Sequence, residues 1–442
     1  MKNQDKTFIF SSCHFHSQKK IAYFRYAIGS IKFEEIIEFG NKKTKLSEKK
    51  IRAINKILPL LHLAVGISYY KAFICPKIKI KSFRISAKVA DFFNTFYFKG
   101  LGEFAYQNKV DLRFLKTLFT KDEQSEKSKP EKLVLSNKVG IPLGGGKDSI
   151  VALDIIKSEG TPVIGFSVGS FKEPKEIAKI ANIPFFEIKR KIDPKLFDLN
   201  EEGVFNGHVP VVGILSFIAV IAAIIFDFDT IVFANEKSSS AGNTIYFGEE
   251  INHQWSKSFE FENNFRDLLR DFTGESISYF SILRPFSEIE IANKFSKLKK
   301  FHKTFVSCNK NYQIKERSQN KWCGNCDKCR FVFLALACNL KKDRLIDIFS
   351  GKNLLNDKTQ VEGFRELVGI QGHKPFECVG EVEESRQLFS CLAKEKEWKD
   401  DSVIKKINNQ IKPSLNNKHQ LVETINEEDL WKNIPTIFKN KI

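Results

Sequence analysis

The sequence has little methionine, few cysteines for its length and no apparent export signal. Its 442 residues include one Met and nine Cys, against 42 Phe. A disulfide-stapled secreted scaffold would be far richer in cysteine. Phe8–Phe10 is the only apolar core at the N-terminus, and it is too short for a signal peptide. We therefore expect a reducing, cytoplasmic location.

A run of uncharged residues raises the question of a membrane span. Residues 209–226 carry no charge, and their eighteen residues reach the lower limit for a membrane helix. Pro210 and Gly213 near the start leave only about fourteen residues of good helix. The run also lies between two strand-like segments. We therefore predict a helix buried against a parallel sheet, and no membrane span.

Overall composition is that of an ordinary folded protein. Hydrophobic residues make up 42% of the chain and charged residues 28%, which excludes a disordered or collagen-like chain. The formal net charge of +18 favours the approach of anions. Nucleic acid, an anionic membrane and a multiply charged small substrate all remain open at this point. Because the lysines are spread along the chain, a solvated surface is the simplest explanation.

Pattern and composition divide the chain into three parts. The first part alternates strand-like pieces with an apolar, helix-like stretch at 57–72 and carries no chemical motif. A charged segment at 121–132 has the composition of a linker. The last part is polar with helical patterning. We predict an N-terminal α+β substrate or cap domain, a central domain that holds both motifs below, and a mostly helical C-terminal region, at 1–125, 126–345 and 346–442.

The central part alternates short apolar runs with helical segments. Strands are predicted at 139–143, 161–168, 183–188 and 230–234. Helices are predicted at 149–157, 173–181 and 213–226. This alternation is typical of an α/β fold, in which a doubly wound, mainly parallel sheet is covered by helices on both faces.

A glycine-rich loop lies where the first of these strands ends. Its residues are Pro142, Leu143, Gly144, Gly145, Gly146, Lys147, Asp148 and Ser149. Three glycines let backbone N–H groups approach a ligand, and the helix that follows directs its positive end to the same place, so a phosphate is the expected guest. Lys147 adds charge, and Asp148 with Ser149 can cap the helix or hold a metal ion.

The loop differs from two common phosphate-binding motifs. A Walker A loop would need Gly in place of Ile141 and Ser or Thr in place of Asp148. A dinucleotide fingerprint would need glycine in place of Ser149. A glycine-rich turn without a ligand is the simpler alternative.

Cysteines form the second motif. Cys323, Cys326 and Cys329 have the spacing C-x2-C-x2-C, and Cys308 lies fifteen residues upstream. Four thiolates at this spacing can enclose a tetrahedral zinc ion. An iron–sulfur cluster is the main rival, although the ferredoxin-type run would want a fourth Cys near Phe333. Unligated buried cysteines are the third alternative. We predict a structural zinc site.

The glycine loop resembles the Ser-Gly-Gly-x-Asp-Ser loop of the ATP pyrophosphatase, or PP-loop, superfamily, with Gly144 in place of the leading Ser. Members of this superfamily, whose fold is adenine nucleotide α-hydrolase-like, bind ATP, release pyrophosphate and place AMP on an oxygen of the substrate. The resemblance implies ATP at residues 144–149 and Mg²⁺ near Asp148 or Ser149. It also implies adenine contacts from the backbone of the second strand, at Phe166 and Val168. The cysteine spacing is similar to the zinc site of 7-cyano-7-deazaguanine synthases.

Further polar strings narrow the resemblance. They occupy residues 206–211, 234–243, 252–258, 284–288 and 372–381. In their order they resemble the UDP-N-acetylmuramoyl-L-alanyl-L-glutamate epimerases of peptidoglycan synthesis, over about residues 20–390. This resemblance implies ATP- and Mg²⁺-dependent inversion of the terminal L-glutamate of a UDP-N-acetylmuramoyl-dipeptide. Adenylation of the glutamate carboxylate would acidify its α-hydrogen, with release of AMP and pyrophosphate.

Inversion requires proton-transferring groups on both faces of the α-carbon. By residue type, the candidates in these strings are His208, His253, His373 and Cys378. Each of them could instead be a structural residue. Lys257 and Arg284 could pair with a substrate carboxylate or diphosphate, or could form surface salt bridges.

Two other functions fit parts of the sequence. A tRNA- or nucleobase-modifying PP-loop enzyme would share the loop, the zinc site and the positive charge. However, no Lys- and Arg-rich tract with interleaved aromatics marks a nucleic-acid groove, so we expect no nucleic-acid partner. A non-enzymatic nucleotide-binding or zinc-scaffold protein would need few of the polar strings at strand ends.

Overall fold

A computed structural model describes residues 6–40, 45–122, 129–312, 321–372, 374–411 and 426–439. Within these residues, nine strands form one sheet in the order β11-β8-β5-β6-β7-β3-β2-β1-β4. The strands are β1 Thr7–His16, β2 Ile21–Ile28, β3 Ile31–Glu38, β4 Lys77–Ile80, β5 Val139–Pro142, β6 Val163–Val168, β7 Phe185–Lys191, β8 Thr230–Phe233 and β11 Ser278–Ser281. A separate hairpin joins β9 Thr244–Tyr246 to β10 Glu249–Ile251.

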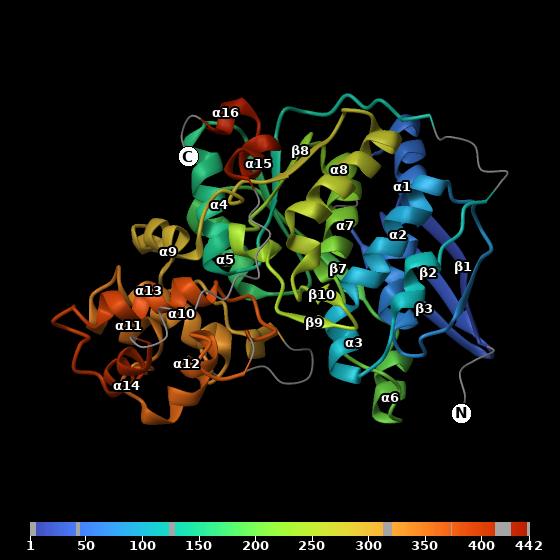
Figure 1. Cartoon of the computed structure of the whole chain (residues 1–442). Coiled ribbons are helices and arrows are strands. Elements are labelled where there is room, and N and C mark those ends of the chain that lie inside the picture. The colour runs from blue at the N-terminus through green and yellow to red at the C-terminus, as the bar shows by residue number, and fades with distance from the viewer. Residues whose placement is uncertain are drawn as a thin grey trace.

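Helices surround the sheet (Figure 1). Those of the first half are α1 Glu48–Tyr70, α2 Ala87–Gly100, α3 Gly102–Asn108, α4 Lys147–Ser158, α5 Lys172–Ala181, α6 Lys195–Glu201 and α7 Val211–Phe226. Those of the second half are α8 Phe259–Thr273, α9 Glu288–Ser296, α10 Asp327–Ala337, α11 Lys342–Ile348, α12 Val361–Leu367, α13 Val382–Leu392, α14 Ser402–Ile411, α15 Glu427–Lys432 and α16 Thr436–Lys439. Helices α10–α14 gather at the end of the molecule opposite the β1–β3 strands (Figure 1).

The predicted α/β fold with a mainly parallel sheet is confirmed. Strands β11, β8, β5, β6 and β7 run parallel to one another. The N-terminal strands β1–β3 form an antiparallel meander, and β3 pairs with β7. Strands from the predicted first and second domains therefore belong to one sheet. The proposed boundary near 125 falls on residues 123–128, which lie outside the described part of the chain, so the three-domain division stays a prediction.

Side chains of one strand alternate between two separate cores. In β8, Ile231 and Phe233 pack into the core beneath α1 and α7, while Val232 packs into the core beneath α4 and α10. Successive strand residues point to opposite faces, so this alternation shows that helices cover the sheet on both sides. It also explains why the central strands are continuous apolar runs in the sequence.

The uncharged run at 209–226 forms the buried helix that its pattern predicts. Helix α7 begins at Val211, directly after Pro210, and most of its side chains are inaccessible to solvent. Among the described residues, α1 is the one helix with the length and composition of a membrane span, and 72% of its apolar window is buried inside the protein. A core helix of this kind passes the same composition test as a membrane helix.

The strand order places the glycine loop at a topological switch point. From β5 the chain continues to β6 and β7 on one side, whereas β8 pairs with the other side of β5. The carboxyl ends of β5, β8 and β11 therefore meet along one edge of the sheet. Ligand sites of open α/β sheets lie at such an edge.

Gly140 in β5 leaves room for the ring of Phe228, which follows the C-terminal end of α7. A Cβ at this position would lie 2.2 Å from the ring of Phe228. We expect Gly140→Ala to lower the free energy of unfolding by about 1–3 kcal/mol, because the ring has to move. Gly144→Ala is the matched control, since a Cβ there meets nothing within 4 Å. Equal midpoints of urea unfolding for the two variants would contradict this packing.

Candidate active site

The glycine loop connects β5 to α4 and forms a cradle of backbone N–H groups. Gly146 is the N-cap of α4, and no side chain caps the first turn. Gly145 has φ +87°, a backbone conformation that favours glycine. Its carbonyl accepts a hydrogen bond from Val306 N at 2.9 Å, which fixes the loop against a distant segment. The arrangement suits an anion such as a phosphate.

Lys147 lies between two carboxylates and is fully buried. Its Nζ donates to Asp148 Oδ1 at 2.5 Å and also to Glu288 at the first residue of α9. Burial opposes the charge of this lysine, but Asp148 and Glu288 raise its pKa above the usual range. Lys147 is therefore a buried cation that neutralises two acidic groups beside the loop.

Cys378 is the centre of a second polar group. Its Sγ accepts a hydrogen bond from Lys257 Nζ at 3.0 Å, and a further hydrogen bond joins it to His253. Burial alone would raise the pKa of the thiol. Lys257, His253 and Lys328 together lower that pKa to about 5, so Cys378 is a thiolate at neutral pH.

Glu103 forms a hydrogen bond with the imidazole of His253. Its Nδ1 donates to Glu103 Oε2 at 2.5 Å. Burial opposes the imidazolium, but the hydrogen bonds to Cys378 and Glu103 raise the pKa of His253 to about 9. His208 Nδ1 lies 3.3 Å from the same Glu103 oxygen. Burial and the positive charges of His253 and Lys257 lower the pKa of His208 to about 3, so this ring is neutral.

The structure brings three of the four predicted catalytic residues together. His208, His253 and Cys378 come from separate segments and converge beside Glu103, with 4.6 Å between the two imidazole ring centroids. The fourth, His373, lies outside the described residues. Glu103 was not predicted, because it stands on α3 in a segment without a motif and 150 residues before its partner His253.

Two polar side chains anchor the loops that carry these groups. Asn243 accepts a hydrogen bond from His253 N at 2.9 Å and donates one to Pro375 O at 3.0 Å. Lys328 donates through its backbone N to Glu377 Oε2 at 2.7 Å, and through Nζ to the carbonyl of Cys378. The position of the thiolate therefore depends on both the β8–β9 connection and the first turn of α10.

Electrostatic contacts join the loop and the thiolate into one site. Burial would raise the pKa of Asp148, but Lys147, Lys328 and Lys257 lower it. In turn, Cys378, Glu236 and Asp148 raise the pKa of Lys257 despite its burial. A group bound at the glycine loop is thus within range of the charges that surround Cys378.

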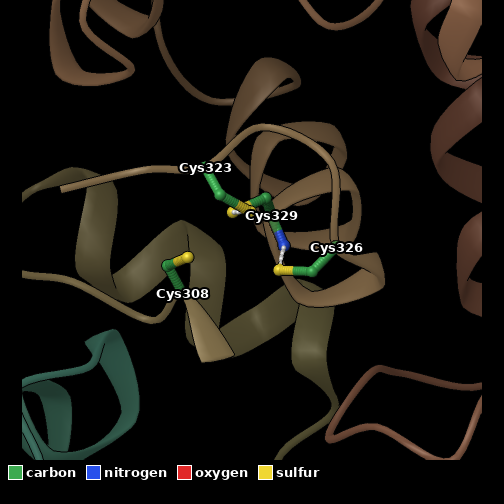
Figure 2. A group of neighbouring side chains, drawn as sticks. All are labelled: Cys308, Cys323, Cys326 and Cys329. Carbon is green, nitrogen blue, oxygen red and sulfur yellow. Dashed lines mark hydrogen bonds between the residues drawn. The ribbon is translucent and has the colours of Figure 1, made fainter. Parts of the chain in front are cut away.

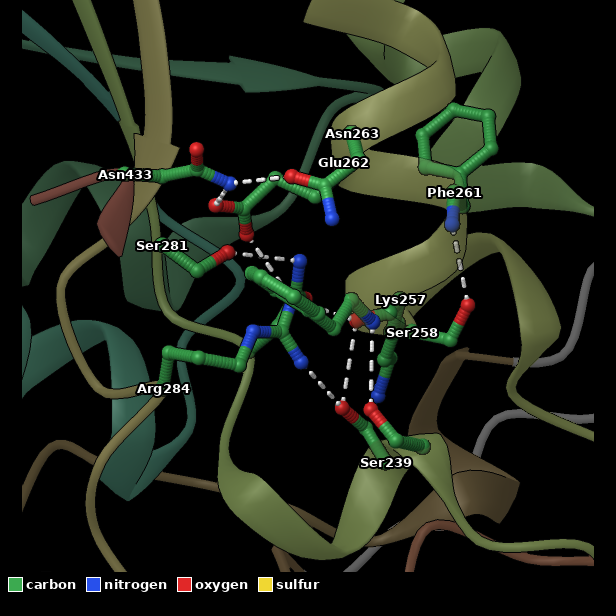
Figure 3. A network of polar contacts seen from close by, with 12 residues as sticks. Ser239, Lys257, Ser258, Phe261, Glu262, Asn263, Ser281, Arg284 and Asn433 are labelled. Carbon is green, nitrogen blue, oxygen red and sulfur yellow. Dashed lines mark hydrogen bonds and ion pairs between the residues drawn. The ribbon is translucent and has the colours of Figure 1, made fainter. Parts of the chain in front are cut away.

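Arg284 has a structural place beside this site. It is 1% exposed, and its guanidinium donates to Lys257 O at 2.7 Å and to Glu262 Oε2 at 2.9 Å. It also donates to Ser239 Oγ at 3.0 Å (Figure 3). The sequence offered a substrate contact or a surface salt bridge for Arg284, whereas the structure shows a buried ion pair with Glu262. Arg284 fixes the backbone of Lys257, whose side chain reaches Cys378.

The four cysteines of the second motif converge as their spacing predicts (Figure 2). The sulfur atoms of Cys308, Cys323, Cys326 and Cys329 all lie within 4.8 Å of one another. Gly324, with φ +78°, forms the turn between the first two ligands of the motif. Backbone N–H groups of Asn325 and Cys329 each lie 3.4 Å from a sulfur atom. Four converging thiols with this support fit a zinc ion.

The two residues expected to contact adenine lie on β6. Phe166 is buried in the core, and its carbonyl accepts a hydrogen bond from Leu143 N at 2.7 Å. Val168 ends the strand and is half-buried. The carbonyl of Phe166 is thus engaged by the loop, and the contribution of both residues to nucleotide binding stays a prediction.

Metal content tests the cysteine site. We expect about one zinc ion per chain in the purified protein. Cys326→Ser should lose the metal and lower the free energy of unfolding by about 2 kcal/mol or more, because the ion would link the start of α10 to the more distant segment at Cys308. Cys391→Ser, at an exposed cysteine outside the cluster, is the control. The site would be refuted if the purified wild-type protein contained no metal and if Cys326→Ser unfolded at the same midpoint as the wild type.

Alkylation of Cys378 tests its ionisation. Only the thiolate reacts with iodoacetamide, so the rate should fall below a midpoint near pH 5, with a plateau above it. Lys257→Met should move this midpoint upward by about one pH unit or more, since the strongest stabilising charge is removed. The Cys378 peptide is followed by mass spectrometry. A midpoint that Lys257→Met leaves unchanged would show that the ammonium does not stabilise the thiolate.

Comparison with known proteins covers nearly the whole chain. Residues 1–282 match the family described as MurL N-terminal domain, and residues 304–422 match MurL C-terminal domain. A UDP-N-acetyl-alpha-D-muramoyl-L-alanyl-L-glutamate epimerase of Xanthomonas oryzae pv. oryzae is 39% identical over 426 residues, which cover 96% of this chain and 94% of the relative.

Two actinobacterial relatives carry the same name. The protein of a Micromonospora species is 38% identical, and the matched region covers 87% of this chain and 86% of that relative. The protein of Salinispora tropica is 37% identical, and the matched region covers 90% of this chain and 87% of that relative. With this degree of identity over nearly full length, the chain belongs to the family of UDP-N-acetyl-α-D-muramoyl-L-alanyl-L-glutamate epimerases.

Proposed function

We propose that this protein inverts the terminal L-glutamate of UDP-N-acetylmuramoyl-L-alanyl-L-glutamate to D-glutamate, with ATP consumed to adenylate the glutamate carboxylate. The names of the relatives support the reaction and the substrate. One observation of the structure supports the mechanism: a thiolate flanked by an ammonium and an imidazole shares a charged site with a phosphate-binding loop. Such an enzyme would act in peptidoglycan precursor synthesis, and we expect it in the cytoplasm.

Adenylation addresses the main chemical difficulty of the inversion. A carboxylate beside the α-carbon resists loss of the α-hydrogen, because the resulting carbanion would place a second negative charge next to the first. Esterification of that carboxylate with AMP removes its charge and lets the carbonyl accept the new charge as an enolate. The energy comes from cleavage of ATP to AMP and pyrophosphate, so no pyridoxal cofactor is needed.

Roles follow from position. In this proposal the N–H groups of the glycine loop and of the first turn of α4 bind the phosphates. Carboxylates suit Mg²⁺, and Asp148 and Glu288 are the pair next to the loop. Mg²⁺ would neutralise phosphate charge there. Lys147, which already bridges the two carboxylates, keeps them oriented.

Three groups can move the α-hydrogen. His253 and Lys257 each contact Cys378, and each of the three groups can hold or release a proton. Inversion needs a donor and an acceptor on opposite faces, and in this proposal Lys257 and His253 take these two roles. Glu103 orients His253, and His208 is the neutral neighbour behind it.

Variants separate the two half-reactions. Asp148→Asn should reduce substrate-dependent exchange of pyrophosphate into ATP by about 100-fold, since charge at the loop is needed for adenylation. Cys378→Ala should keep that exchange within about threefold but lose exchange of the α-hydrogen with D₂O by about 100-fold or more. Cys391→Ser is the control for both assays. A Cys378→Ala enzyme that still exchanges the α-hydrogen at the wild-type rate would remove the thiolate from the mechanism.

A further inference from the structure

The environment of Cys378 is that of a nucleophile. Its Sγ contacts Lys257 Nζ at 3.0 Å and is joined by a hydrogen bond to His253, whose Nδ1 contacts Glu103 at 2.5 Å. A cysteine next to an imidazole that is itself oriented by a third group is the arrangement of covalent acyl-transfer catalysts. A cysteine that only relays a proton would not need both an adjacent imidazole and a third group that orients this imidazole.

Proton abstraction is a poor use of this thiolate. The two cations that stabilise it also make it a weak base, and the best general bases have a pKa near the working pH. Nucleophilicity falls less steeply than basicity as a thiol becomes more acidic, with a Brønsted coefficient of about 0.4–0.5. The same contacts that weaken Cys378 as a base therefore leave it an effective nucleophile.

We propose that Cys378 attacks the carbonyl carbon of the adenylated glutamate and that inversion takes place on the resulting thioester. This inference rests on the proposed function, because it needs the acyl adenylate. The Sγ–C bond forms, the bond from that carbon to the AMP oxygen breaks, and AMP leaves with the bonding electron pair. The α-hydrogen of a thioester is much more acidic than that of the free carboxylate, since sulfur donates electron density only weakly to the carbonyl and the thioester carries no negative charge.

Acylation also prepares the neighbouring groups for proton transfer. The negative charge of Cys378 is a main support for the protonated forms of both His253 and Lys257. Formation of the thioester removes that charge, so the imidazolium can release its proton and act as base. Lys257, 3.0 Å from Sγ, remains an ammonium that can return a proton to the α-carbon.

Hydrolysis completes the cycle. A water molecule attacks the thioester carbon, the C–S bond breaks, and Cys378 leaves as a thiolate with the bonding pair. The water oxygen stays in the product carboxylate. His253 first passes the α-proton on to the amine of Lys257, which restores the ammonium, and then takes one proton from the water, while the other water proton passes to solvent. Overall, one ATP and one water give AMP and pyrophosphate for each acylation, the same balance as direct hydrolysis of the adenylate.

The loop geometry supports a covalent role. The carbonyl of Cys378 is bound by Lys328 Nζ, and the carbonyl of Pro375 by Asn243, so the backbone on both sides of the thiolate is fixed. The side chain itself is half-buried and therefore partly accessible. A sulfur that is held by its backbone, partly accessible and in one charged site with the glycine loop is suited to attack a carboxylate activated there.

Trapping the acyl-enzyme tests this inference. The full-length enzyme is mixed with Mg-ATP and the UDP-N-acetylmuramoyl-dipeptide, quenched in acid during the first turnover, and analysed by intact-mass and peptide mass spectrometry. We expect an adduct with the mass of the substrate minus water on the peptide that contains Cys378. His253→Gln should slow hydrolysis by about 100-fold and make the adduct the main species. Cys391→Ser should give the wild-type adduct.

The outcomes distinguish this inference from the proposed function. If AMP and D-glutamate form in the first turnover while no adduct is found in the wild type or in His253→Gln, the thioester is refuted and the proposed function stands. If the wild type forms no pyrophosphate from ATP in the presence of substrate, the proposed function itself fails. An adduct on Cys378 that forms and disappears at the rate of turnover confirms the thioester.

Discussion

The first turn of α10 is the constraint on which the site depends most. It contains two of the four converging cysteines, Cys326 and Cys329, and between them Lys328, which binds the Cys378 carbonyl and, through its backbone, Glu377. The loop that carries Glu377 and Cys378 is thus bound to the same turn of α10 that carries two of the clustered cysteines. A zinc ion there would act on the chemistry indirectly, by holding the helix end that holds the thiolate in place.

Charge balance is the second constraint. Lys147 and Lys257 are cations next to the buried or half-buried anions Asp148, Glu288 and Cys378. Burying any one of these charges alone would cost several kcal/mol, so each depends on a partner. In the proposed function, a substrate with phosphates and carboxylates would meet cations that are already positioned by these ion pairs. The positive net charge of the chain favours the approach of such an anion.

Local patterns predicted much of this structure, and long-range contacts account for what was missed. The glycine loop, the buried helix at 211–226 and the cysteine cluster each depend on residues close in sequence, and their placement follows from spacing and periodicity. Strand β11, only four residues long, carries no pattern of its own and exists because β8 offers it a parallel partner. Glu103 could not be predicted, because a single acidic residue on a short helix has no signal until folding brings His253 to it. Lys328 lay within a predicted motif, yet its contact with Cys378 depends on a loop fifty residues further along.

The most direct test of the account follows AMP, pyrophosphate and the handedness of the terminal glutamate in one reaction of the wild-type protein with Mg-ATP and UDP-N-acetylmuramoyl-L-alanyl-L-glutamate. The account predicts that D-glutamate appears together with AMP and pyrophosphate, and that omission of ATP stops all three. Inversion at an undiminished rate without ATP would contradict carboxylate activation. AMP and pyrophosphate formed without any inversion would contradict the assigned reaction.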